Sequence, residues 1–167
     1  ATYFHKDSKM CKKTIVSTVL WSFLLTAPAV MAMSTTTHIA CVKTNKQEIS
    51  ALFDRWNKSL KTGDATNVNA NYTDNAVLLA TISNAPRVTS AERIAYFKDF
   101  VSKHPIGKID SRTISIGCNK AIDTGLYTFT LKNGKQLHAR YTFTYLWNGH
   151  KWLISSHHSS TLPESTS

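Results

Sequence analysis

A guanidinium and two hydroxyl groups are predicted to share one face of a long strand in the second half of the chain. Arg140, Thr142 and Thr144 alternate with aromatic residues, and every second side chain of a strand points to the same side of the sheet. A buried arginine needs acceptors for its five N–H donors, and a carboxylate accepts two of them side by side. We therefore expect Arg140 to bind an anionic ligand, with an internal acidic partner as the alternative. The candidates for that partner are Asp74, Glu92 and Asp123.

Two adjacent histidines lie on the last predicted strand. His157 and His158 face opposite sides of the sheet, so they do not bind one metal ion together. The remaining histidines and cysteines lack the spacing of a structural metal site, and we expect no metal and no cofactor. His157 shares its face with Ser159, and we expect both to contact the ligand. A histidine with a purely structural role is the alternative.

Tyrosines in the first half of the chain complete the candidate ligand-binding set. Tyr72 is included in that set, and with Tyr96, Asp74 and His157 it also offers the groups of an acid/base pair. The spacing of these residues matches neither a nucleophile elbow nor a zinc-binding helix. We assign no catalytic residue, and the alternative is that these aromatic side chains belong to the core.

Helices are predicted before the strands. Thr44 and Gln47 have the spacing of a capping box, which predicts a first helix that ends at Gly63. Asp64 is expected to cap a short second helix that continues to Tyr72. A strand is expected over residues 76–82. Thr89 with its partner at position 92 predicts a third helix, which ends before Pro105.

Four long antiparallel strands are predicted over the rest of the chain, at residues 108–117, 120–131, 136–147 and 151–160. The Asn-Gly pairs at 133–134 and 148–149 are typical of two-residue hairpin turns. Helices followed by a run of strands indicate an α+β fold with the helices packed on one face of the sheet.

The two faces of this sheet differ in character. Tyr141, Phe143, Tyr145 and Trp147 form an aromatic row opposite the face of Arg140. Soluble monomers rarely expose such a row, so we expect a second subunit to cover one face and form a homodimer. The alternative is that the aromatic row faces the helices and the Arg140 face is wet.

The first part of the chain has the features of an export signal. Residues 10–32 combine lysines, an apolar stretch and a small-residue cleavage pattern, which predicts a cleaved signal peptide, a secreted or periplasmic protein and no retained membrane anchor. Residues 1–9 would be an extension or a remnant, 33–45 a linker, 46–164 the domain and 165–167 a tail. The net charge is +10, but the lysines and arginines are scattered, so we expect no nucleic-acid partner.

Cys41 and Cys118 are the two cysteines that remain after the predicted cleavage. Export places them where disulfides persist, which favours one bridge between them. Two buried thiols are the alternative.

Several segments of residues 46–164 resemble the nuclear transport factor 2-like superfamily, and more narrowly the bacterial branch similar to the association domain of calcium/calmodulin-dependent protein kinase II. The resemblance is carried by residues 51–56 (ALFDRW), 71–78 (NYTDNAVL), 123–130 (DTGLYTFT), 139–143 (ARYTF) and 151–160 (KWLISSHHSS). It implies a cone-shaped, cystatin-like sheet curved around the helices, a pocket inside the cone and dimerisation through the sheet. Kinase association domains line that pocket with arginines, and Arg140 lies two positions from one of them.

Three functions follow as hypotheses. The first is a periplasmic, homodimeric module that binds a small anionic or partly apolar molecule and has no kinase attached. The second is an isomerase, dehydratase or cyclase that uses the same pocket. The third is a purely structural oligomerisation domain.

Overall fold

The structure is a computed structural model and describes residues 40–81 and 83–163. The predicted extension, signal peptide and tail, and the linker before residue 40, lie outside the described residues. None of the helices in this part of the chain is long and apolar enough to cross a bilayer.

Helix α1 (Lys46–Leu60) begins one residue later than the sequence predicted. Asn45, not Thr44, is the N-cap, and its side chain accepts from the amide of Glu48. The Glu48 carboxylate in turn accepts from Thr44 Oγ1 and from Asn45 Nδ2. Asn45 is as good a cap as a threonine, and its extended backbone fixes the start of the helix.

The two shorter helices follow their capping signals. Asp64 caps α2 (Ala65–Asn69), which ends earlier than predicted because Tyr72 already begins a strand. The predicted capping box of α3 (Ser90–Val101) is confirmed, since Thr89 and Glu92 exchange both hydrogen bonds. Arg93 of α3 is fully buried and donates to the carbonyls of residues 73, 74 and 76, which fixes α3 against the first strand.

The strands form one five-stranded sheet in the order β1-β5-β4-β3-β2. Strands β2 (Ile106–Gly117), β3 (Lys120–Thr130), β4 (Gln136–Trp147) and β5 (Trp152–Thr161) pair antiparallel as predicted. Strand β1 (Tyr72–Leu79) lies four residues earlier than expected and pairs parallel with β5. The α+β fold predicted from the sequence is confirmed.

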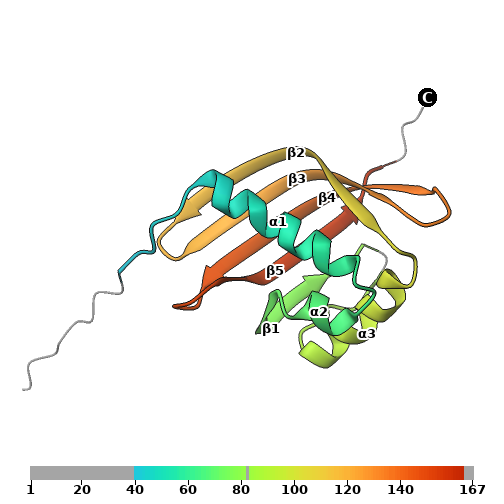
Figure 1. The fold of residues 1–167 in the computed structure, drawn as a ribbon, viewed down its shortest axis with the longest axis horizontal. Coiled ribbons are helices and arrows are strands. Elements are labelled where there is room, and N and C mark those ends of the chain that lie inside the picture. Colours follow the sequence, from blue (N-terminus) through green and yellow to red (C-terminus); the bar gives the residue numbers. More distant parts are fainter. Residues whose placement is uncertain (1–39, 82, 164–167) are drawn as a thin grey trace, which may run out of the picture. The chain divides into compact units, whose positions relative to one another are not determined.

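The aromatic row of β4 faces the helices of the same chain. Tyr141, Phe143 and Tyr145 are each at most 2% exposed, and α1 lies across that face of the sheet in Figure 1. The helices therefore bury the aromatic row, and it does not call for a second subunit. Arg140 is on the opposite, exposed side.

Strand β5 departs from strict alternation. Ile154 pairs with Tyr145 and Ser156 with Thr144, so Ser155 is the extra residue of a bulge. Trp152 and Ile154 therefore face the core together with His157, whereas strict alternation along the strand would place them on the face opposite His157.

A second bulge, between Ile109 and Ser111 of β2, presses the backbone of β2 against β3 at Gly125. A Cβ atom at Gly125 would overlap the carbonyl oxygen of Ser111. Only glycine fits this point of the sheet.

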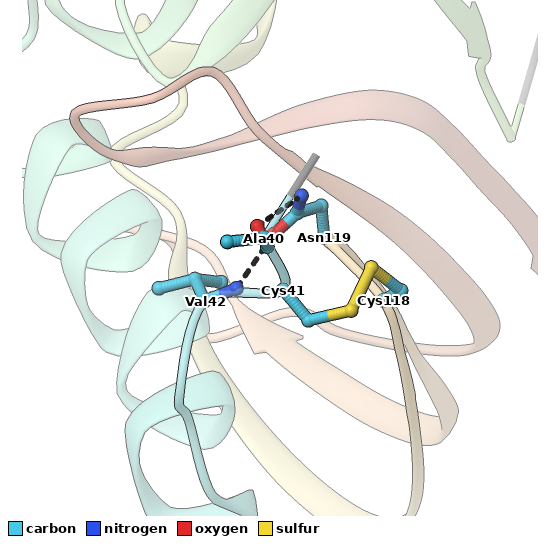
Figure 2. Close-up of a disulfide and its surroundings, with 5 residues drawn as sticks. All are labelled: Ala40, Cys41, Val42, Cys118 and Asn119. Atoms are coloured by element: carbon cyan, nitrogen blue, oxygen red, sulfur yellow. Dashed lines mark hydrogen bonds between the residues drawn. A yellow bond between two sulfur atoms is a disulfide. The ribbon is translucent and has the colours of Figure 1, made fainter. Parts of the chain in front are cut away.

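The predicted bridge between Cys41 and Cys118 is present and joins residues separated by 77 positions. Figure 2 shows how Asn119 completes the attachment. Its side chain accepts from the Val42 amide at 2.8 Å and donates to the Ala40 carbonyl at 3.2 Å. The segment before α1 is thereby held at the β2–β3 turn.

Candidate functional site

A cavity of about 670 Å³ lies between the sheet, α1 and α3. Its walls are mainly apolar and come from every layer of the fold. They include Trp56 of α1, Leu78 of β1, Phe97 and Phe100 of α3, Phe129 of β3 and Leu137 of β4. A volume of this size is typical of small-molecule sites.

A buried imidazole lies on the cavity wall. His157 of β5 is 3% exposed, and its Nδ1 lies 2.9 Å from the Tyr72 hydroxyl. Trp56 Nε1 donates to the same hydroxyl at 3.0 Å. Burial, with a smaller contribution from the neighbouring His158, lowers the pKa of His157 to about 3, so the ring is neutral at pH 7.

The contacts of the Tyr72 hydroxyl bear on the tautomer of His157. An indole N–H can only donate, so the Tyr72 hydroxyl accepts from Trp56. Toward His157 Nδ1 the same hydroxyl either donates or accepts a second bond, because its oxygen has two lone pairs. Where it donates, the ring proton of the neutral imidazole resides on Nε2. Nε2 is buried and has no partner among the described residues, and His157 lines the cavity.

Three hydroxyl groups form a chain beside this imidazole. Tyr127 donates to Ser159 Oγ at 2.5 Å, and Ser159 contacts the hydroxyl of Thr81. All three residues line the cavity. Burial raises the pKa of Tyr127 well above 10, so its hydroxyl stays protonated at neutral pH.

The cavity has a positively charged mouth. Lys103, Lys132 and Lys135 are exposed and line it together with Arg87, and Asp99 is the acidic residue of the lining. This excess of positive charge favours anions at the entrance.

The predicted ligand-binding residues divide between the two faces of the sheet. His157 and Ser159 line the cavity. Tyr72 does not line it but forms a hydrogen bond with His157. Arg140, Thr142 and Thr144 do not line it.

Arg140, which we expected in the cavity, therefore lies outside the cavity lining. It alternates with Tyr141, whose side chain is buried under the helices, so Arg140 must point outward. Its Nη1 reaches the carbonyl of Thr161 at 3.4 Å. None of the predicted internal partners pairs with it: Glu92 caps α3, the Asp74 carbonyl accepts from Arg93, and Asp123 binds Arg112.

Asp123 belongs to a separate buried network under α1. Its Oδ1 accepts from Arg112 Nε at 3.1 Å and from the Tyr141 hydroxyl at 2.8 Å. Burial raises the pKa of Asp123, and the bonds from Tyr141 and Arg112 oppose that rise. Arg112 of β2 and Asp123 of β3 thus connect neighbouring strands, and neither lines the cavity.

Sequence reasoning missed Thr81, Arg87 and Tyr127. Tyr127 was detectable, because it shares a strand face with Phe129 in a predicted strand. Thr81 and Arg87 lie beyond the end of β1, in a segment without regular structure that carries no periodic signal. Across residues 40–81 and 83–163, no three His, Cys, Asp or Glu side chains come close enough to hold a metal ion.

The fold and site define a class of α+β pocket proteins whose curved sheet encloses a cavity with its helices. Residues 45–163 match the family described as the calcium/calmodulin dependent protein kinase II association domain, and the chain belongs to that family. None of the curated proteins matches the chain.

Several solved structures are similar. An association-domain protein from Xanthomonas campestris is 44% identical over 73% of this chain and 91% of its own, with a TM-score of 0.69. A nuclear transport factor 2-like protein from Pseudomonas putida is 18% identical over 72% of this chain and 88% of its own, with a TM-score of 0.63. A cyanobacterial iota-carbonic anhydrase in complex with bicarbonate is 21% identical over 73% of this chain and 94% of its own, with a TM-score of 0.66. The last two share the fold.

Proposed function

We propose that the cavity is the active site of a hydro-lyase that interconverts carbon dioxide and bicarbonate. The observation that carries this proposal is the unpartnered Nε2 of neutral His157, on the wall of a mainly apolar cavity that also contains the hydroxyl groups of Ser159 and Tyr127. In the proposed tautomer this nitrogen carries the ring proton. Apolar walls suit a small neutral substrate, and fixed donors suit the oxyanion that forms from it.

A structural neighbour supports this choice of reaction. The iota-carbonic anhydrase that shares the fold was crystallised with bicarbonate. The second hypothesis from the sequence, a pocket enzyme of the dehydratase type, includes this reaction.

The proposed step needs one water molecule and no redox partner. The water oxygen forms a bond to the carbon of carbon dioxide, one C=O π bond becomes a C–O⁻, and a water proton leaves to solvent through the mouth. His157 Nε2–H donates to the developing oxyanion, and the hydroxyl chain of Ser159, Tyr127 and Thr81 orients the water. Trp56 and Tyr72 hold His157 in the donating tautomer.

The test uses two pairs of identical neighbouring residues on β5, His157–His158 and Ser159–Ser160. We would measure carbon dioxide hydration by stopped flow for His157→Phe and Ser159→Ala. Their matched controls are His158→Phe and Ser160→Ala, whose side chains lie on the other face of the strand. Loss of an oxyanion donor lowers kcat by roughly a hundredfold, so His157→Phe should lose that much. Ser159→Ala should also lower kcat, because it removes a hydroxyl that orients the water, and both controls should keep wild-type rates.

Equal rates for the inward variants and their controls would contradict the proposal. A wild-type rate no faster than buffer alone would also contradict it.

A second candidate function is binding without reaction. It is favoured by the low pKa of His157, about 3, which makes this imidazole a weak proton acceptor at neutral pH. For this function we expect calorimetry with bicarbonate to show saturable binding that Ser159→Ala weakens. Stopped flow should then show no hydration above the rate in buffer.

We further propose that the protein is exported, cleaved after residue 32 and homodimeric. The disulfide supports an oxidising compartment, and membership of an association-domain family supports self-assembly. Native mass spectrometry of protein purified from the periplasm tests both points. A monomer, or a chain that retains residues 10–32, would contradict the corresponding part.

A further inference from the structure

The cavity is much larger than the proposed substrate. At the liquid share of roughly 30 Å³ per water-sized group, the four heavy atoms of bicarbonate occupy about 120 Å³, against about 670 Å³ in the cavity. Most of the remaining wall is aromatic or aliphatic, from Phe97, Phe100, Phe129 and Leu137. A second, apolar occupant fits this part of the cavity.

Arg87 supplies a fixed cationic group on the cavity wall. Its backbone is held by two hydrogen bonds to Leu78, at 3.0 and 2.9 Å. The guanidinium Nη2 donates to Ser83 Oγ at 3.2 Å, while the buried Nε–H has no partner among the described residues.

No described carboxylate forms a salt bridge with Arg87. The nearby Glu92 uses its Oε2 on the amides of Val88 and Thr89. An unpaired buried donor on a cation is costly, and Arg87 lines the cavity, so a ligand carboxylate there would supply the acceptors that its guanidinium lacks. The lysines of the mouth add to the attraction for an anion.

We propose that the cavity binds a monocarboxylate with an apolar body, such as a medium-chain fatty acid. Its carboxylate pairs with Arg87, and its hydrocarbon chain packs against the aromatic wall formed by α3 and β3. This ligand occupies the same cavity as the proposed reaction but does not depend on that reaction.

The probe is octanoate, measured by calorimetry at neutral pH and low salt, with octanamide as the uncharged analogue. Octanoate should bind once per chain and at least tenfold more tightly than octanamide. Arg87→Gln should weaken octanoate at least tenfold, which is about 1.4 kcal/mol, and leave octanamide unchanged. The matched control is Arg140→Gln on the outer face of the sheet, which should bind octanoate like wild type.

Equal affinity for octanoate and octanamide would overturn the proposal, as would the same loss in both arginine variants. If Arg87→Gln fails to fold by circular dichroism, Arg87→Lys replaces it. That variant keeps the charge but loses the paired donors, and unchanged octanoate affinity would then overturn the proposal.

The outcome is separable from that of the proposed function. A protein that hydrates carbon dioxide but does not distinguish octanoate from octanamide loses this inference alone. A protein that binds octanoate through Arg87 but shows no hydration loses the proposed reaction alone.

Discussion

At the scale of single residues, the site depends on a histidine whose protonation is set by its neighbours. His157 is surrounded by aromatic rings, including Phe143 with a centroid distance of 4.1 Å and Trp56 at 5.4 Å. Such surroundings disfavour the charged imidazolium. The same burial that keeps the ring neutral at pH 7 also makes the fold sensitive to acid.

The free energy of unfolding should decrease as the pH is lowered, because His157 is buried in its neutral form. Its pKa is about 3 in the folded state and near 6.5 in the unfolded chain. Below pH 6.5 the unfolded state therefore binds a proton that the folded state does not, and stability decreases as the pH falls from 6.5 towards 3. Between pH 7 and pH 5 this linkage amounts to about 2 kcal/mol.

Urea unfolding at both pH values checks this expectation. His157→Gln should lose about 2 kcal/mol less than wild type over that interval. His158→Gln, at the exposed neighbour, should retain the wild-type pH dependence. Parallel pH profiles for wild type and His157→Gln would show that His157 titrates normally in the folded protein.

The hydroxyl of Tyr72 should contribute to stability through its two hydrogen bonds. Tyr72→Phe leaves both Trp56 Nε1 and His157 Nδ1 without their partner, and each buried unsatisfied group costs about 1–3 kcal/mol. Thermal or urea unfolding should show a loss of at least about 2 kcal/mol. Tyr96→Phe, at a half-buried tyrosine on the cavity wall, is the control and should change stability little.

At the scale of secondary-structure elements, periodicity predicted the existence of the strands better than the direction of their side chains. The hairpins and the four long strands followed from alternation and Asn-Gly turns. The inward direction of Trp152 and Ile154 did not, because the Ser155 bulge shifts the alternation by one residue. Arg140 was placed in the cavity for another reason. Alternation shows which residues share a face of the sheet, but it does not show which face the helices cover.

The close approach of β2 to β3 at Gly125 leads to a prediction about substitutions at this glycine. Gly125→Ala should be severely destabilising, by more than about 2 kcal/mol, or should prevent folding, because its methyl group overlaps the backbone of Ser111. Gly117→Ala is the matched control on the neighbouring strand, since its nearest atom would be 3.8 Å away. Circular dichroism and urea unfolding of both variants measure the contrast. Equal stability of the two would mean that β2 and β3 separate easily at this point.

At the scale of the whole molecule, the sequence predicted the fold class, the family and the disulfide, but only part of the site. His157, Ser159 and Tyr72 lie together, since strand pairing brings β1 beside β5. Thr81 and Arg87 come from a segment without strand or helix periodicity, and the backbone pair between Leu78 and Arg87 positions it. An isolated bridge of this kind leaves no periodic pattern from which its partners could be predicted.

The disulfide should contribute substantially to stability. A crosslink between residues 77 positions apart restricts the unfolded chain and is worth about 4.5 kcal/mol on the chain-entropy model. The double variant Cys41→Ser with Cys118→Ser should lose about that amount in urea unfolding. Wild type measured in a reducing agent should show the same loss, and an unchanged midpoint in both experiments would contradict the expectation.

The Ser155 bulge has a consequence for how the chain tolerates change in length. It precedes two doublets of identical residues, His157–His158 and Ser159–Ser160, and it decides which member of each doublet faces inward. If the strand were straightened by slipping one position, His158 and Ser160 would take the inner places. The interior would then still receive one imidazole and one hydroxyl. Because each doublet consists of two identical residues, a one-residue shift in strand register would leave the same side-chain types on this wall of the cavity.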